Sequence, residues 1–171
     1  MRLYAMLFRQ YLSLKMDAFR IAALLTIAFI DCSLSATKSK CDVVTALRAE
    51  GVLDKDMRDW LCLVQHESNY EYNVTKVKMV GSAIGSTTLG IFQFNNAYWC
   101  GNANGTSSPT CWKLRTFGCA DACNTFLDSD ISNDANCAVR VKNCDGFHTW
   151  VGWAQNCVND TTAPSYDYSG C

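Results

Sequence analysis

Three cysteines mark the most informative stretch of the sequence, Cys119-Ala-Asp-Ala-Cys123-Asn-Thr-Phe-Leu-Asp-Ser-Asp-Ile-Ser-Asn-Asp-Ala-Asn-Cys137. They belong to a set of 11 cysteines in a chain of 171 residues, a count that is unusual for the reducing cytosol. The length and the 49% hydrophobic content suit one domain with an ordinary core. The cysteines therefore predict a single domain held by disulfides in an oxidising compartment.

The N-terminus has the pattern of a secretory signal peptide. Residues 21–30 form a ten-residue apolar run, and small residues follow it as far as Ala36. A membrane span needs roughly 20 apolar residues, and Asp31 ends this run too early. We therefore expect a signal peptide over residues 1–36, with Met16 as an alternative initiator, and a secreted, extracellular product.

Removal of that segment leaves residues 37–171, which we expect to form one domain. Cys32 is lost, so ten cysteines remain, an even number that suits a full set of disulfides. The removed segment carries four basic and two acidic residues, which changes the net charge from −1 to −3. A mildly acidic protein is repelled by nucleic acid and by anionic bacterial walls. We therefore expect no nucleic-acid partner. We also expect a monomer that has no membrane association after signal cleavage.

Three Asn-x-Ser/Thr sequons suit a secreted glycoprotein, and they begin at Asn73, Asn104 and Asn159. Glycosylation would place each of these asparagines in a surface loop. Such triplets also occur by chance, so occupancy of each site is a prediction.

Helical and strand patterns follow one another in blocks along the chain. Helical patterns cover residues 41–50, 54–67, 133–141 and 149–155, and a segment rich in Val, Thr and Ile with interspersed glycines covers 73–94. Gly51 is a candidate C-cap of the first helix, and Asp54 is a candidate N-cap of the second. Helices, a small antiparallel sheet and further helices predict an α+β fold whose two lobes meet at a cleft.

Residues 119–137 match, position by position, the signature of the C-type lysozyme and α-lactalbumin family. Further matching motifs stand around them: Trp60-Leu-Cys62, His66-Glu-Ser-Asn69, Gly90-Ile-Phe-Gln-Phe-Asn95, Tyr98-Trp-Cys100 and Trp150-Val-Gly-Trp153. The resemblance extends from Lys40 to Cys171. It implies the C-type lysozyme fold, with a helical lobe and a small antiparallel β lobe on either side of a cleft.

The resemblance also implies four disulfides: Cys41–Cys171, Cys62–Cys157, Cys100–Cys123 and Cys119–Cys137. Cys111 and Cys144 are left over and have no counterpart in the usual family pattern. We predict that they pair with each other and link the two lobes near one end of the cleft. The alternative is two free thiols, which are uncommon in a secreted chain.

Glu67 is the candidate general acid. Glycoside cleavage needs an acid that stays protonated near neutral pH, and an apolar pocket achieves this by raising the pKa, as it does in lysozyme itself. The resemblance makes Trp150 the apolar neighbour of Glu67 in the cleft. The alternative is a solvent-facing glutamate at a helix C-terminus, where the helix dipole disfavours its charge.

Thr88 stands where the family places its second catalytic carboxylate, two residues before Gly90. A retaining glycosidase holds that nucleophile about 5–5.5 Å from the acid. No Asp or Glu lies between Tyr72 and Cys100, so nothing nearby in the sequence replaces it. A threonine hydroxyl cannot stabilise an oxocarbenium ion as an anion does, and we therefore expect weak or no hydrolysis.

The resemblance implies sugar-binding residues at Asn69, Gln93, Asn95, Tyr98 and Trp99. Flat aromatic faces suit sugar rings, and side-chain amides pair with sugar hydroxyls. The alternative for the aromatic residues is core packing, which we prefer for Trp60 and Trp153. Ala97 replaces a residue that is often larger and polar in the family, which would loosen one subsite.

Calcium-binding members of the family place their ligands at positions that correspond here to Thr125, Asp128, Asp130, Asn133 and Asp134. Oxygen groups at this spacing would supply several of the six to eight ligands that Ca²⁺ takes. The alternative, which we prefer, is capping of the following helix by Ser132 or Asn133. We expect no other cofactor, because His66 and His148 have no ligand partners at a useful spacing.

Two functions follow. The first is a lysozyme-like glycosidase that recognises β-1,4-linked GlcNAc/MurNAc glycan, in peptidoglycan or a chitin-like polymer, with impaired hydrolysis. The second is a catalytically inactive binding or interaction protein on the same scaffold, for which α-lactalbumin is the family precedent. The acidic net charge weakens the specific case of defence against bacteria, because attraction to anionic walls is lost.

Overall fold

The computed structural model describes residues 36–101, 119 and 121–171, which all fall within one structural unit. Its elements in chain order are α2 (Lys40–Ala49), α3 (Asp54–Ser68), β1 (Thr75–Val80), β2 (Ala83–Leu89), β3 (Phe94–Asn95), η2 (Cys123–Phe126), α5 (Ser132–Asp145), η3 (Phe147–Thr149), α6 (Val151–Asn156) and η4 (Pro164–Tyr166). This order of helices and a small antiparallel sheet confirms the predicted α+β class and the C-type lysozyme fold.

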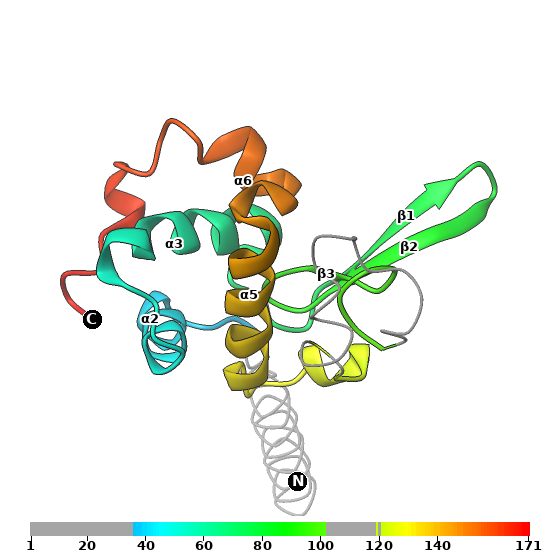
Figure 1. Ribbon diagram of the computed structural model, residues 1–171, viewed down its shortest axis with the longest axis horizontal. Helices are drawn as coiled ribbons and strands as arrows, with labels where there is room; N and C mark the ends of the chain where they lie inside the picture. Colours follow the sequence, from blue (N-terminus) through cyan, green and yellow to red (C-terminus); the bar gives the residue numbers. More distant parts are fainter. Residues whose placement is uncertain (1–35, 102–118, 120) are drawn as a thin grey trace, which may run out of the picture. The chain divides into compact units, whose positions relative to one another are not determined.

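Helix α3 supplies the centre of the core and lies among α2, α5 and α6 (Figure 1). The predicted apolar face of this helix is buried, with Met57, Trp60, Leu61 and Val64 almost completely shielded from solvent. Other elements meet the indole ring of Trp60 edge-on, since the ring centroids of Phe92, Phe147 and Trp150 lie 5.8, 4.8 and 5.9 Å away. Aromatic pairs in this arrangement add stability beyond the area they bury.

Of the two helix ends predicted around residues 50–54, one is confirmed and the other differs from the observed one. Gly51 follows the last residues of α2 in the left-handed conformation at φ +77°, as its prediction as a stop requires. Asp54 is the first residue of α3 and not its cap, and its carboxylate accepts from the guanidinium of Arg48 at 3.2 Å. The helix dipole also favours an acid in the first turn. The sequence therefore indicated the correct helix end, but the cap is the preceding residue.

The start of α5 corrects the capping prediction as well. Ile131 precedes the helix, and neither Ser132 nor Asn133 caps it with its side chain. Asp130 instead accepts a hydrogen bond from the backbone N–H of Ser132 at 3.0 Å. The amide of Asn133 points back to the preceding segment and donates to the carbonyl oxygen of Thr125 at 3.1 Å.

The sheet has the order β1-β2-β3, and all its strands are antiparallel. Lys76 pairs with Thr88 across β1 and β2, and Thr88 pairs with Asn95 across β2 and β3. Gly90 ends β2 at φ +78° beside η2, where a Cβ atom would collide with the carbonyl oxygen of Phe126. A glycine is therefore required at the point where the sheet meets the core.

The structure contains the four disulfides that the family resemblance implied: Cys41–Cys171, Cys62–Cys157, Cys100–Cys123 and Cys119–Cys137. Cys144 is also disulfide-bonded. Its predicted partner Cys111 lies outside the described residues, so that bridge stays a prediction. Among the described helices, none is both long and apolar enough to cross a membrane.

Candidate functional site

A cavity of about 180 Å³ lies where α3, the sheet and α6 meet. Its lining residues come from four separate parts of the chain: Glu67, Thr88, Gln93, Asn95, Trp99, Thr149, Trp150 and Val151. Six of these eight were singled out from the sequence, and Thr149 and Val151 were not. Glu67 is the only acid among the described residues that line the cavity.

Glu67 occupies the last turn of α3, with its carboxylate turned toward α6. Its Oε1 accepts a hydrogen bond from the backbone N–H of Gly152 at 2.8 Å. Burial raises the pKa of Glu67 above its ordinary value, and the Gly152 hydrogen bond and the nearby charges of Lys76 and His66 oppose that rise. A carboxyl group in this setting holds its proton to higher pH than a solvent-facing glutamate does.

Gly152 was not recognised in the sequence as a partner of Glu67. A Cβ atom at this position would lie 2.7 Å from the Oε1 of Glu67, so any side chain here would displace the carboxylate. The motif Trp150-Val-Gly-Trp153 contained the signal, because a glycine inside a helical segment often marks a close approach of another group.

Thr88 lines the same cavity, and its hydroxyl group takes part in a local network of hydrogen bonds. Oγ1 of Thr88 donates to Oε1 of Gln93 at 2.7 Å. The amide nitrogen of Gln93 in turn donates to the carbonyl oxygens of Gly90 at 2.7 Å and Val74 at 3.1 Å. The position expected to hold a second carboxylate is therefore neutral, and it is fixed by hydrogen bonds.

Lys76 is a further charged residue that the sequence did not single out. It lies opposite Thr88 in the strand register, and its ammonium group donates to the backbone carbonyl oxygen of Glu67. The candidate acid thus has a cation beside it, while Thr88, where we predicted that a second carboxylate is replaced, offers a hydroxyl group. Strand pairing brings Lys76 to Thr88, and the separation of 12 residues in the sequence gave no sign of it.

The predicted aromatic platform is divided between two environments. Trp99 is buried and lines the cavity, whereas Tyr98 is 49% exposed and is not among its lining residues. Their ring centroids are 6.4 Å apart and their planes are tilted by 60°, so they do not form one flat surface. Trp150 is buried above Trp60, and its indole N–H donates to the carbonyl oxygen of Phe92 at 2.8 Å.

Two of the predicted sugar-binding residues with amide side chains, Asn95 and Asn69, lie in different environments. Asn95 lines the cavity, and its side chain donates to Ser86 at 3.2 Å and accepts from the backbone N–H of Ala97 at 2.8 Å. Asn69 is not among the lining residues. It ends α3 in the left-handed conformation, at φ +54° and ψ +38°, which asparagine adopts more readily than most residues. Helix termination is therefore a sufficient reason for its presence.

The carboxylates among the candidate calcium ligands do not form one compact group. Among the described residues, the carboxylates of Asp128, Asp130 and Asp134 do not form a group close enough to share one ion. The backbone oxygen of Thr125 already accepts from Asn133, and Asp130 accepts from Ser132. Asp134 is the exception, since neither of its buried carboxyl oxygens accepts a hydrogen bond from another described residue. Only Asp134 therefore offers a carboxylate in need of a partner, and calcium binding stays a hypothesis.

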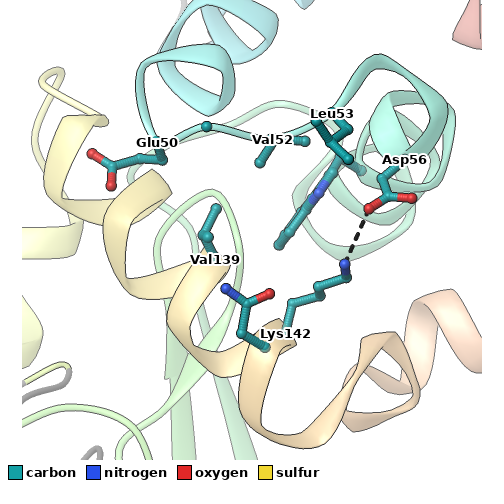
Figure 2. A pocket seen from close by; sticks show the side chains of 9 residues that line it. Glu50, Val52, Leu53, Asp56, Val139 and Lys142 are labelled. Carbon is teal, nitrogen blue, oxygen red and sulfur yellow. Dashed lines mark hydrogen bonds and ion pairs between the residues drawn. The ribbon is translucent and has the colours of Figure 1, made fainter.

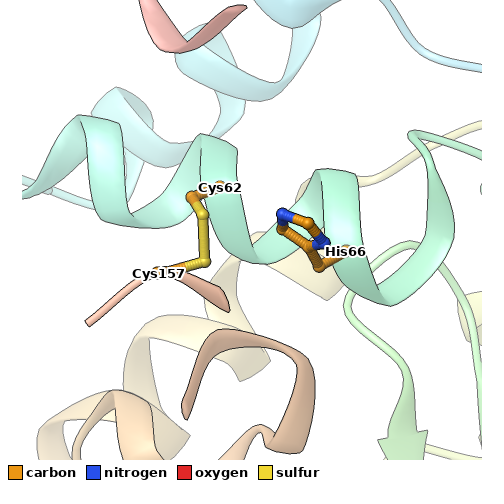
Figure 3. A group of neighbouring side chains, drawn as sticks. All are labelled: Cys62, His66 and Cys157. Atoms are coloured by element: carbon orange, nitrogen blue, oxygen red, sulfur yellow. A yellow bond between two sulfur atoms is a disulfide. The ribbon is translucent and has the colours of Figure 1, made fainter. Parts of the chain in front are cut away.

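Cys62, His66 and Cys157 lie together at the surface of α3, with one potential ligand atom from each within 4.8 Å of the others (Figure 3). Both sulfur atoms are consumed by the Cys62–Cys157 disulfide, so they cannot act as thiolate ligands. His66 instead lies 3.3 Å from the hydroxyl of Tyr166, which matches its expected role as a local polar contact.

A second cavity, of about 210 Å³, lies between the α2–α3 connection and α5 (Figure 2). Lys142 and Asp56 form an ion pair of 3.1 Å across it, and Val52, Leu53 and Val139 supply apolar walls. It contains none of the candidate catalytic or sugar-binding residues.

Asn73 and Asn159, two of the three predicted glycosylation sites, are exposed, and Asn104 lies outside the described residues.

Comparison with known proteins identifies the family of this chain. A model of the C-type lysozyme/alpha-lactalbumin family matches residues 36–171. The "Lysozyme c-1" of Anopheles gambiae is 33% identical over 142 residues, which are 83% of this chain and 91% of that protein. The "Lysozyme" of Galleria mellonella is 33% identical over 137 residues, or 79% and 99% of the two chains. The "Lysozyme C-1" of Mus musculus is 32% identical over 144 residues, or 80% and 90%. The chain therefore belongs to the C-type lysozyme/alpha-lactalbumin family.

Proposed function

We propose that this protein is secreted after cleavage of residues 1–36 and recognises β-1,4-linked GlcNAc/MurNAc glycan, in peptidoglycan or a chitin-like polymer, with weak or no hydrolysis. The observation that carries the proposal is the pairing, in one cavity, of a desolvated acid at Glu67 with a neutral residue at Thr88. Family membership supports a lysozyme-like role in glycan binding or hydrolysis.

The acid alone supports only half of the reaction. Glu67, with its raised pKa, is suited to donate a proton to a glycosidic oxygen. Bond cleavage then leaves positive charge on the sugar ring. An anion about 5 Å from that charge contributes about 3 kcal/mol at an effective dielectric constant of about 20, or roughly a hundredfold in rate. Thr88 offers no such anion, and no covalent route through a carboxylate is open to it.

Lys76 strengthens this argument. Its ammonium group donates to the backbone carbonyl oxygen of Glu67, and Lys76 pairs with Thr88 across the strands, so it adds positive charge beside a site where the transition state would develop more. The same charge is compatible with binding a neutral or acidic sugar in the ground state. The charges at the cavity thus favour recognition over turnover.

The binding side of the cavity keeps groups that suit a sugar. Asn95 lines the space with an amide, and Trp99 and Trp150 line it with indoles. Gln93 also lines it, although its amide is already engaged by Thr88, Gly90 and Val74. These residues make the glycan-binding form preferable to an interaction protein that uses only the scaffold. That second form would gain support if the cavity bound no sugar.

Incubation of the secreted protein with GlcNAc oligomers tests the proposal when both binding and products are measured. Calorimetry should detect binding, while chromatography detects little or no shorter oligomer. Asn95→Ala should weaken binding, whereas Gln155→Ala, an exposed amide outside the cavity, should leave it unchanged. Rapid product formation would contradict the proposal, and absence of binding would favour the interaction protein.

A further inference from the structure

The free end of the β1–β2 hairpin exposes large apolar side chains. Val77, Met79, Val80 and Ile84 have between 51% and 66% of their surface in solvent, and every residue of β1 is exposed. Met79 pairs with Ile84, and Val80 pairs with Ala83 next to the turn, so Met79, Val80 and Ile84 lie at the tip, while Val77 pairs with Thr87 farther back. Figure 1 shows the hairpin extending away from the helices. A cluster of this kind on a folded domain usually marks a binding surface.

The positive charge of this region is separated from the acidic remainder of the chain. Residues 73–99 contain Lys76 and Lys78 and no acid. Residues 37–171 carry a net charge of −3, so the part outside this segment carries −5. Our expectation of no membrane association followed from the cleavage of the signal segment and did not consider how charge is distributed over the rest of the chain. The charge distribution instead turns one end of the molecule toward anionic partners and the rest away from them.

The spacing of charge and apolar groups along the hairpin fits a lipid interface. A strand rises about 3.3 Å per residue, which places Lys78 about 7 Å and Lys76 about 13 Å behind Val80 along β1. Interfacial segments bury their apolar groups about 5–10 Å below the headgroups. With the tip at that depth, Lys78 would lie at the level of the lipid phosphates.

We propose that the hairpin tip of Met79, Val80 and Ile84, with Lys78 and the exposed Val77 behind it, docks on an anionic lipid surface. A second copy of this chain fits less well, because pairing two tips would bring the lysines of both copies together. An apolar protein groove would use the apolar side chains but would leave Lys78 without a partner. The lipid surface satisfies both features, and it leaves the Glu67 cavity free.

Vesicle flotation tests the proposal with the secreted protein and vesicles of phosphatidylcholine, with and without phosphatidylserine. Binding should require phosphatidylserine and should weaken as salt is added, because surface charges are screened. Lys78→Glu should weaken binding about 30-fold, since it changes two charges and each is worth about fivefold at an anionic surface. Val80→Ser combined with Ile84→Ser should weaken it at least about tenfold.

Matched substitutions elsewhere should leave vesicle binding unchanged. Val158→Ser removes a side chain that is 56% exposed outside the hairpin, and Lys55→Glu reverses a charge at the exposed start of α3. Thermal unfolding and GlcNAc-oligomer binding of the hairpin variants should equal those of the wild type, which separates this proposal from the proposed function. Three results would overturn the proposal: no binding to either vesicle, equal loss in hairpin and control variants, or hairpin-dependent dimers without lipid binding in light scattering.

Discussion

Asp134→Asn should raise the free energy of unfolding at neutral pH when calcium is absent. Asp134 is only 1% exposed, and neither carboxyl oxygen accepts a hydrogen bond from another described residue. Burial raises the pKa of Asp134 to about 8, and the neighbouring charges of Asp128, Asp130 and Asp121 add to the rise. The folded state therefore keeps a proton that the unfolded chain, with a pKa of about 3.8, releases above pH 4.

The sign and size of the effect follow from this difference. Because the folded state binds the proton more tightly, the contribution of Asp134 to stability is greatest below pH 4 and is lost as the pH rises from 4 to 8. At pH 7, retaining the proton costs about 4 kcal/mol, since each pKa unit corresponds to about 1.4 kcal/mol. Asparagine removes that cost but leaves a buried amide without partners, which costs about 1–3 kcal/mol, so we expect a net gain of about 1–3 kcal/mol.

Urea unfolding from pH 5 to pH 8 in the presence of a chelator measures this gain. The wild type should lose stability across the range relative to Asp134→Asn, while Asp160→Asn, at an exposed aspartate, should follow the wild type. Parallel pH profiles for the wild type and Asp134→Asn would refute the reasoning. Repeating the measurement with calcium tests the calcium hypothesis, because an ion bound at Asp134 would stabilise the wild type and not the variant.

Three further predictions concern the cavity, the core and the fifth disulfide. Gly152→Ala should raise the pKa of Glu67 further, because the new methyl group displaces the carboxylate from its hydrogen bond; an unchanged pKa in an NMR titration would contradict this. Phe92→Ala should lower the free energy of unfolding by about 3–5 kcal/mol, and a loss below about 1 kcal/mol in urea unfolding would be inconsistent with its complete burial. Unreduced peptide mapping should recover Cys111 and Cys144 in one linked fragment, whereas separate fragments would rule out the bridge.

Sequence patterns predicted the helices and strands well, because side-chain periodicity depends only on residues that are close in the sequence. The apolar face of α3 was read from side-chain periodicity, and Met57, Trp60, Leu61 and Val64 are all buried. The four described disulfides came from the family resemblance, since spacing alone leaves many pairings open.

Helix ends were less predictable, because several short polar residues compete to cap the same turn. Asp54 and Ser132 each lie within one position of a helix start, yet neither serves as the cap. A shift of one residue changes which backbone N–H groups are free, so composition alone cannot choose between neighbours.

The contacts that shape the candidate site could not be predicted, because they join distant parts of the chain. Gly152 meets Glu67 across 85 residues, and Lys76 reaches Glu67 only after β1 and β2 pair. Asn69 and Tyr98 were expected in the cleft from matching positions, yet they are not among the residues that line the cavity. The motif correctly selected residue types, whereas only the packing decided which side chains face the cavity.

Clearance of a bacterial cell-wall suspension by the wild type and by Thr88→Asp tests the central claim most directly. Thr87→Asp is the matched control, since adjacent strand residues point to opposite faces of the sheet. The account predicts little clearance by the wild type, a gain of roughly a hundredfold in Thr88→Asp, and loss of that gain when Glu67→Gln is added. Rapid clearance by the wild type, or no gain in Thr88→Asp, would contradict it.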